Sequence, residues 1–469
     1  MKKTLLFLFC AVTAAMSGMA ITDNQTYEPV NGIKVVNKWI FDREHTGEAY
    51  TSNAICSQRA RTAVMDDGII YVSRSEELTV IVGNDTLAQS VIHRFNAADG
   101  SPLPDLPLTL DGAPYTRFLG VASIGVDHFH HIWVAPMTST AQNTVPIYMV
   151  NTETGELTLV VEMNKDGIMQ RTDYCDVMGD LTGEQAECNI MTLAGATAEP
   201  GFPTAYRMHL EQGATEWEGG FEGDYYIDYV DFYPETNTGF SLAPVVKMVL
   251  NTEDEEKLYS GELFYVDCFG RDPVLYDISG SLIDTFEDTS DDVKQTDKNA
   301  NGVAEFTLEG RNFLAYPKGQ YDKNGNGCQI YVCELGEGMA LSGLTKYWQL
   351  PADSLGKVSD SGLRVHCINT AKSVDDEGNE VITLFTFKAY NGMGIYEIGV
   401  NVGGEEPGPG LKGDVDGNGA VNVSDVTALV NMILGVVPKD EERADVDGNG
   451  AVNVSDVTAL VNIILGVTQ

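Results

Sequence analysis

Between residues 21 and 401, apolar side chains occur in short alternating or β-branched runs, and glycine-rich polar segments separate these runs. Such runs are typical of strands, whereas no segment here shows the sustained 3.6-residue period of a long helix. Seven runs predict strands, at 68–75, 131–137, 146–150, 262–269, 329–335, 381–387 and 394–400. The pattern therefore predicts a mainly β domain over residues 21–401.

The predicted strands follow a recurring order, in which a strand ending in Asn-x-x-[Asp/Thr]-Gly precedes a leucine-rich strand. Phe95–Gly100 precedes Leu106–Leu110 in this way, and Val150–Gly155 precedes Leu157–Val160 after an offset of 55 residues. Tyr276–Gly280 is a weaker copy. Repeats of roughly 40–50 residues with several strands each are typical of β-propeller blades. We expect about seven blades, with six or eight as alternatives, and an array of β-sandwiches as the alternative architecture.

The end of the chain changes character, because residues 414–435 return at 445–466 with one difference in 22 positions, Met432 against Ile463. In each copy, apolar residues fall at i, i+3, i+4, i+7 and i+8, which places them on one face of a helix. The two stripes are Val426, Leu429, Val430, Ile433 and Leu434, and Val457, Leu460, Val461, Ile464 and Leu465. Gly435 and Gly466 are suited to end these helices. A small all-α module is predicted over residues 413–469.

Each predicted helix follows a loop with the oxygen spacing of an EF-hand calcium site, at loop positions 1, 3, 5, 7, 9 and 12. The first set is Asp414, Asp416, Asn418, the Ala420 carbonyl, Asn422 and Asp425. The second set is Asp445, Asp447, Asn449, the Ala451 carbonyl, Asn453 and Asp456. A single loop of this kind could be a chance acidic turn, but two complete loops predict two calcium ions. The ions would also stabilise a module too small for a large core.

These residues resemble a type I dockerin, because position 12 is Asp, the entering helix is missing and residues 436–444 resemble the dockerin connector. The resemblance implies calcium-dependent docking onto a cohesin module of a scaffold protein. It also implies partner contacts at loop positions 10 and 11, which are Val423 and Ser424 in one loop and Val454 and Ser455 in the other. The family often has Ser-Thr there. Because the copies are nearly identical, we expect a partner to dock in two orientations.

Two further segments complete the predicted domain organisation. Residues 402–412 form a Gly/Pro-rich linker. Residues 1–20 have the charged start, apolar run and small residues of a secretory signal peptide. A lipid-attachment site at Cys10 is the less favoured alternative, because bulky residues precede it. No later apolar run is long enough to span a membrane. The chain is therefore expected to be secreted, in an extracellular, cell-surface or periplasmic location.

The formal net charge of −40 argues against nucleic acid as a partner and favours cations such as calcium. Seven cysteines remain after the predicted cleavage, and their odd number and irregular spacing do not indicate a disulfide framework. No Cys-x-x-Cys pair indicates a structural zinc site.

Four segments of the large domain contain candidate chemistry. Residues 127–131 carry His128 and His130, which fit either a turn before a strand or the beginning of a metal site. Residues 297–302 and 322–327 begin like calcium loops but lack the final carboxylate, so hairpin turns are the favoured interpretation. Residues 217–233 interleave aromatic and acidic side chains, which suits either a sugar site or an ordinary blade strand. No hydrolase, metalloprotease or phosphate-loop motif is present.

The large domain also resembles uncharacterised secreted bacterial β-propellers, loosely, through residues 60–75 and 173–183. That resemblance identifies no active residue. The leading hypothesis is a glycan- or protein-binding propeller that a dockerin attaches to an extracellular or cell-surface assembly in polysaccharide utilisation. The alternatives are a glycoside hydrolase or polysaccharide lyase on the propeller, and a purely structural adaptor.

Overall fold

The computed structural model consists of two compact units, residues 1–400 and 401–469. It describes residues 27–42, 60–74, 78–82, 85–117, 120–139, 141–164, 171–194, 205–219, 226–227, 244–252, 254–268, 272–286, 289–295, 301–319, 327–355, 365–375, 377–389, 391–403, 412–413, 415, 421, 423–434 and 441–465. The predicted signal peptide and most of the predicted linker lie outside these ranges.

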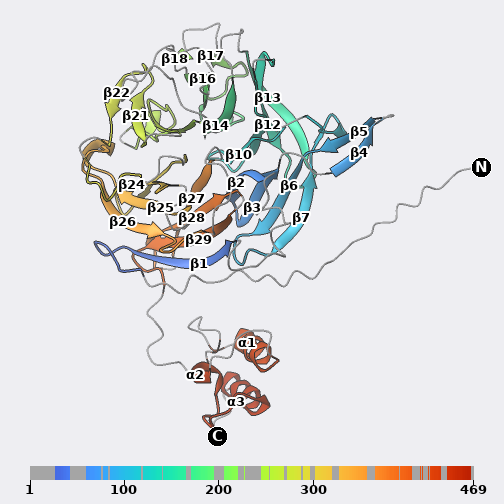
Figure 1. Cartoon of the computed structure of the whole chain (residues 1–469), viewed down its shortest axis with the longest axis vertical. Helices are drawn as coiled ribbons and strands as arrows, with labels where there is room; N and C mark the ends of the chain where they lie inside the picture. Colours follow the sequence, from blue (N-terminus) through green and yellow to red (C-terminus); the bar gives the residue numbers. More distant parts are fainter. Residues whose placement is uncertain are drawn as a thin grey trace, which may run out of the picture. The chain divides into compact units, whose positions relative to one another are not determined.

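In the first unit, six of the seven described β-sheets lie radially around a central axis (Figure 1). We number these blades 1 to 6 along the chain and give the strands of each from the axis outwards. Blade 1 contains β2 (Ala60–Asp66), β3 (Ile69–Arg74), β6 (Val91–Asn96) and β7 (Pro102–Pro107). Blade 2 contains β10 (Ser123–Val126), β11 (Ile132–Ala135), β12 (Thr144–Val150) and β13 (Glu156–Asn164), extended by β8 (Thr109–Leu110) and β9 (Ala113–Pro114).

The remaining blades follow the same antiparallel order. Blade 3 contains β14 (Thr172–Gly179), β15 (Cys188–Ala194), β16 (Ala205–Leu210) and β17 (Glu218–Gly219), and β18 (Tyr226–Ile227) also pairs with β16. Blade 4 contains β19 (Val245–Met248), β20 (Leu263–Asp267), β21 (Val274–Asp277) and β22 (Leu282–Asp284). Blade 5 contains β23 (Ala304–Leu308), β24 (Arg311–Pro317), β25 (Ile330–Glu334) and β26 (Thr345–Leu350). Blade 6 contains β27 (His366–Val374), β28 (Glu380–Lys388), β29 (Gly392–Gly399) and β1 (Lys34–Asp42).

Blade 6 closes the ring, because its outermost strand comes from the start of the described chain. Strand β1 pairs antiparallel with β29 along the register from Lys34 opposite Gly399 to Asp42 opposite Gly392. The Trp39 indole N–H also donates to the Ala97 carbonyl of blade 1, at 2.7 Å. The two ends of the propeller sequence are therefore joined within one sheet, which removes an open edge.

Both faces of the middle strands are buried, because each blade packs against two neighbours. In β3, Ile70 and Val72 contribute to the apolar cluster shared with blade 6, whereas Tyr71 contributes to the cluster shared with blade 2. Six such clusters lie between consecutive blades and complete the circle. This explains why the middle strands read as continuous apolar runs rather than as alternating ones.

The recurring sequence phrase marks one position in the blade, the turn between the third and fourth strands. In blade 1, Asn96 Oδ1 accepts a hydrogen bond from the Ala98 N–H, and the Gly100 N–H donates to the Asn96 carbonyl. Asn151 and Gly155 make the equivalent bonds in blade 2. Gly155 has a φ of +78°, and a Cβ there would lie 2.2 Å from the Pro107 carbonyl oxygen, so the turn requires glycine.

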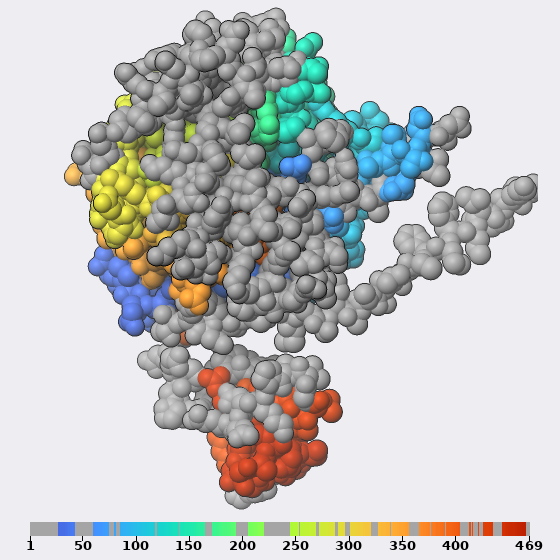
Figure 2. Space-filling view, viewed as in Figure 1, coloured from blue at the N-terminus to red at the C-terminus, as the bar shows by residue number. Residues whose placement is uncertain are grey.

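The β-propeller prediction is confirmed, and all seven predicted runs form strands. Six blades fall within the predicted range and are one fewer than the central expectation. Insertions lengthen individual blades, so chain length divided by a typical repeat gave too high a number. One insertion is the hairpin of β4 (Leu78–Val82) and β5 (Asp85–Gln89), which protrudes in light blue from the rim (Figures 1 and 2). Short 3₁₀ helices are η2 (Glu255–Lys257) and η3 (Glu337–Met339).

The second unit contains the two predicted helices, α1 (Val423–Ile433) and α3 (Val454–Ile464), which pack against each other. A short helix that was not predicted, α2 (Glu441–Ala444), lies in the connector. The buried core contains equivalent residues of the two copies, namely Val415, Val446, Leu429 and Leu460, together with Ala444. The predicted stripes are only partly buried, because Leu434 and Leu465 are 70% and 69% exposed and Val461 is 37% exposed. A two-helix contact covers the middle turns and leaves the last turn in solvent.

The described part of the chain contains no helix whose length and apolar character would let it cross a bilayer.

Candidate functional site

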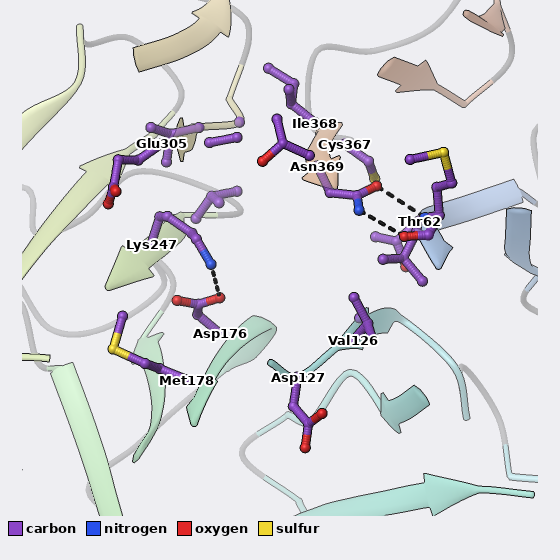
Figure 3. Close-up of a pocket in the computed structure, with 18 of the residues that line it drawn as sticks. Thr62, Val126, Asp127, Asp176, Met178, Lys247, Glu305, Cys367, Ile368 and Asn369 are labelled. Atoms are coloured by element: carbon purple, nitrogen blue, oxygen red, sulfur yellow. Dashed lines mark hydrogen bonds and ion pairs between the residues drawn. The ribbon is translucent and has the colours of Figure 1, made fainter. Parts of the chain in front are cut away.

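The propeller contains a central cavity of about 520 Å³. Its walls are residues on or next to the first strands of all six blades, β2, β10, β14, β19, β23 and β27 (Figure 3). First strands converge on the axis, so polar side chains that are far apart in the sequence border one space. This cavity is the candidate ligand site of the propeller.

An ion pair borders the cavity. Lys247 on β19 places its ammonium 3.0 Å from Asp176 Oδ1 on β14, and the side chains are 28% and 12% exposed (Figure 3). The second oxygen of Asp176 accepts the Met248 N–H at 2.8 Å. Both contacts run from blade 3 to blade 4, so this carboxylate fixes the two strands while it remains part of the cavity wall.

Glu305 on β23 lies on the same side of the cavity as the ion pair (Figure 3). Burial raises the pKa of Glu305 to about 7, although the nearby Lys247 ammonium and a hydrogen bond from the Leu250 N–H oppose the rise. A carboxyl group with this pKa is present in both protonation states near neutral pH, and it can donate or accept a proton. The carboxylates of Asp176 and Glu305 and the Lys247 ammonium thus border one side of the cavity, whose lining also includes Asp66, Asp127 and Lys372.

Other polar side chains of the cavity act mainly as links between blades. Thr62 Oγ1 donates to the Ala122 carbonyl and accepts from the Ile124 N–H, which ties β2 to the next blade. The Asn369 side chain makes two hydrogen bonds to the Met65 backbone, at 2.9 and 3.0 Å, and ties β27 to β2. These residues hold the ring together where the first strands are too far apart to pair.

The histidine segment lies in the turn between β10 and β11, as the turn interpretation predicts. His128 Nδ1 accepts the Gly179 N–H at 3.1 Å, and its ring centroid lies 5.0 Å from that of Tyr259. Burial, followed by the Lys247 charge, lowers the pKa of His128 to about 3, so this imidazole is neutral. His130 instead lies at the surface, 2.7 Å from Asp66. The two rings have separate partners and do not form one metal site.

The third histidine of that turn forms a contact that sequence reasoning missed. His131 Nδ1 lies 2.8 Å from Asp127 Oδ2 and 3.5 Å from Asp180 Oδ1, and ligand atoms of all three residues lie within 4.8 Å of one another. Backbone N–H groups of Leu181 and Gln185 also bind the two carboxylates. These hydrogen bonds explain why the three side chains lie together, because they link blade 2 to blade 3. Asp180 belongs to the neighbouring blade, which no local spacing reveals.

No disulfide joins any two of the six cysteines that the structure describes. They are Cys175, Cys188, Cys268, Cys328, Cys333 and Cys367. Burial raises the pKa of Cys175, Cys333 and Cys367 to about 12, so these thiols are poor nucleophiles.

The second acidic loop of the C-terminal unit gathers three carboxylates. Oxygens of Asp445, Asp447 and Asp456 lie within 4.8 Å of one another. The Asn449 N–H donates to Asp445 and Asp447, and the Gly450 N–H donates to Asp445. Gly450, at loop position 6, has a φ of +85°, which is the sharp turn expected there. The local sequence thus folds the acidic side chains toward one point, which is an arrangement that fits calcium.

The same loop begins helix α3. Asn453 Oδ1 accepts the Ser455 N–H, and Asp456 Oδ2 accepts the Asn453 N–H at 2.8 Å, which forms a capping box. Asp456 is fully buried and its other oxygen accepts the Asp447 N–H. The Ala451 carbonyl accepts from the Asn453 amide. A hydrogen bond from Ser455 lowers the pKa of the exposed Asp447 carboxyl, which favours the charged form that a cation needs.

Of the predicted ligands in the first loop, the structure describes Asp425, which is fully buried like its equivalent Asp456. Asp414, Asp416, Asn418, Ala420 and Asn422 lie outside the described residues, as do the side chains of Val423 and Ser424. Val454 is 69% exposed and Ser455 is also exposed, so both are accessible to a partner. The ligand and partner assignments therefore stay predictions.

The other candidate segments of the propeller lie mainly outside the described residues. This applies to most of 217–233, to 297–300 and to 322–326.

Comparison with known proteins supports both parts of the fold. Residues 412–465 match the family model of the dockerin type I domain. No curated protein matches the chain. A DUF4623 family protein from Bacteroides eggerthii has a similar structure, with a TM-score of 0.53 and 13% identity, over 80% of this chain and 77% of that one. At this identity the likeness shows the fold alone.

Two further solved structures are more distant. An α-L-arabinanase of Penicillium chrysogenum has a TM-score of 0.38 and 8% identity, over 74% of this chain and 95% of that one. An α-L-arabinofuranosidase of Fusarium graminearum has a TM-score of 0.36 and 8% identity, over 72% and 92%. These likenesses are too weak to carry an argument. The family match and the fold together confirm the two resemblances seen in the sequence, a dockerin type I domain at the C-terminus and a β-propeller before it.

Proposed function

We propose that this chain is a secreted modular protein whose dockerin binds two calcium ions and docks the propeller onto a cohesin-bearing assembly. The observation that carries the docking proposal is the convergence of Asp445, Asp447 and Asp456 at the start of α3, within a segment that matches the dockerin family. Three acidic side chains this close repel one another without a cation, and calcium binds carboxylate oxygens of this kind.

The first loop is proposed to hold the second ion, because Asp414, Asp416, Asn418 and Asp425 repeat the second loop and Asp425 is equally buried. Calorimetric titration of the full chain tests this part, since each loop contributes one ion. A dockerin melting temperature that is unchanged by a chelator would contradict it. Export rests on the signal-like residues 1–20 and is tested by the N-terminus of the mature protein.

For the propeller, we propose that the central cavity binds a polar ligand, either a glycan or a protein segment, in polysaccharide utilisation. The cavity is large enough for a few sugar units and has charged and amide groups that can bind hydroxyl groups. Retention of the full chain on a panel of polysaccharides, without product release, is the expected result.

The alternative is a glycoside hydrolase or polysaccharide lyase. It is favoured by one observation, that Glu305 and Asp176 border the same cavity and that Glu305 has the raised pKa of a general acid. Release of reducing ends or unsaturated products from the same panel would establish this alternative. If the Glu305→Gln variant kept its fold but no longer released product, Glu305 would be assigned as the general acid.

A further inference from the structure

Asp267 is a fully buried carboxylate at the end of β20 in blade 4. One of its oxygens, Oδ2, accepts the Gly302 N–H at 3.0 Å and the Gln295 Nε2–H at 3.3 Å. The other oxygen, Oδ1, is buried and has no hydrogen-bond partner. A buried acceptor without a donor is costly, and most buried polar atoms in proteins do have one.

No cationic side chain of the described residues offsets this charge. Burial raises the pKa of Asp267, and a second carboxylate, Asp272, raises it further, while the N–H groups of Gly302 and Cys268 and the Gln295 amide oppose the rise. An ionised carboxylate in such a place costs several kcal/mol unless a positive charge lies beside it. The described part of the chain provides neutral donors here but no positive charge.

A second buried oxygen has the same deficit. Gln295 is 5% exposed, and its Oε1 also has no hydrogen-bond partner. The Gln295 amide touches Asp267 through its Nε2, while its backbone N–H donates to Asp272 Oδ1 at 2.9 Å. Two oxygen atoms without donors thus belong to side chains in direct contact, at the passage from blade 4 to blade 5.

We propose that Asp267 and Gln295 are ligands of a cation held between blades 4 and 5, and that this cation is calcium. Carboxylate and amide oxygens are hard donors, and calcium accepts six to eight of them, including water and backbone carbonyls. The ion neutralises the buried charge and fixes the start of blade 5, because Gly302 lies just before β23. This site is separate from the dockerin loops and independent of the function proposed above.

Calcium titration of the full chain by calorimetry tests the site, together with thermal melting in calcium and in chelator. We expect Asp267→Asn to bind one ion fewer than the unmodified chain and to lose the calcium-dependent rise of the propeller melting temperature. The matched control is Asp284→Asn in the same blade, where the carboxylate accepts the Ser342 N–H and hydroxyl. This control should keep the number of ions.

A double variant, Asp425→Asn with Asp456→Asn, distinguishes the dockerin sites from the propeller site. In this variant the propeller ion should still bind. If Asp267→Asn binds as many ions as the unmodified chain and keeps its calcium-dependent melting shift, the proposal is wrong and Asp267 is simply protonated. Should Asp267→Asn not fold, Gln295→Leu decides: affinity for the propeller ion should fall about tenfold or more, and an unchanged affinity would equally overturn the proposal.

Discussion

Glu305 shows how position on the propeller axis sets the chemistry of one residue. Its carboxyl lies in the wall of a cavity where burial disfavours charge, and Lys247 compensates only in part because Asp176 already binds that ammonium. A glutamate on the outer strand of a blade would be in contact with solvent, and its pKa would stay near the ordinary value. The raised pKa therefore belongs to the site and not to any pattern around residue 305.

Glu305 should make folding stability depend on pH. Its pKa rises from the ordinary value of 4.5 to about 7 in the folded state, so the folded chain holds the proton more tightly than the unfolded chain. Stability should therefore fall as pH rises from about 4.5 through 7, by an amount on the order of 1–3 kcal/mol. Glu305→Gln should match the unmodified chain at pH 4.5 and be more stable at pH 8, in chemical denaturation at both values.

The control for this pH dependence is Glu162→Gln, which makes the same substitution at an exposed position of the outer strand β13. Because Glu162 lies in solvent, its removal should leave the fall in stability between pH 4.5 and pH 8 as it is in the unmodified chain. If Glu305→Gln also kept the full fall in stability, Glu305 would not be its source.

Asp456 combines two roles, since it completes the capping box of α3 with Asn453 and is the proposed ligand at position 12 of the second loop. Asp456→Asn should weaken calcium binding in that loop by about tenfold or more and should cost about 1 kcal/mol of helix stability through the altered cap. Calorimetry and thermal melting measure the two effects. Asp425→Asn, its equivalent, is the matched variant; clearly unequal calcium effects would argue against two like sites.

At the scale of elements, closure of the ring depends on β1. Trp39→Ala removes a buried side chain between blades 6 and 1 and the hydrogen bond to Ala97. The propeller should lose about 3–5 kcal/mol of stability, as measured by denaturant unfolding. Lys38→Ala on the same strand removes only an exposed ion pair with Glu397 and should change stability by less than about 1 kcal/mol. Similar losses in both variants would show that β1 is not required for closure.

The near-identical loop–helix units lead to a prediction for docking. Val423→Asp with Ser424→Asp, or Val454→Asp with Ser455→Asp, should each leave one intact docking face and reduce cohesin affinity only about twofold, or roughly 0.4 kcal/mol. All four substitutions together should abolish binding. Surface-immobilised cohesin measures the affinities, with calcium binding as the control for folding. Complete loss in one pair alone would rule out two-way docking.

At the scale of the whole molecule, the propeller assembles its cavity from six blades, and its ends meet in one sheet. The dockerin needs no such assembly, because each proposed calcium site comes from about twelve consecutive residues. The two units thus differ in how far apart in the sequence their functional groups lie.

This difference in sequence separation explains which features could be predicted from the sequence. Local order determined the strands, the turns that begin at Asn96 and Asn151, the two helices and the second acidic loop, because hydrogen bonds and periodicity within a few residues fix them. The stripe that was expected to include Leu434 and Leu465 was too long, since burial depends on what packs against a helix and not on its period.

The sequence by itself therefore determined the dockerin and the propeller class, and it predicted the calcium ligands. Only the tertiary structure decided the six blades, the closure by β1, the meeting of Asp176, Lys247 and Glu305, and the contact of His131 with Asp180. The physical reason is that first strands from all six blades converge on one axis. Side chains from distant parts of the chain then share one low-dielectric space, which no local pattern encodes.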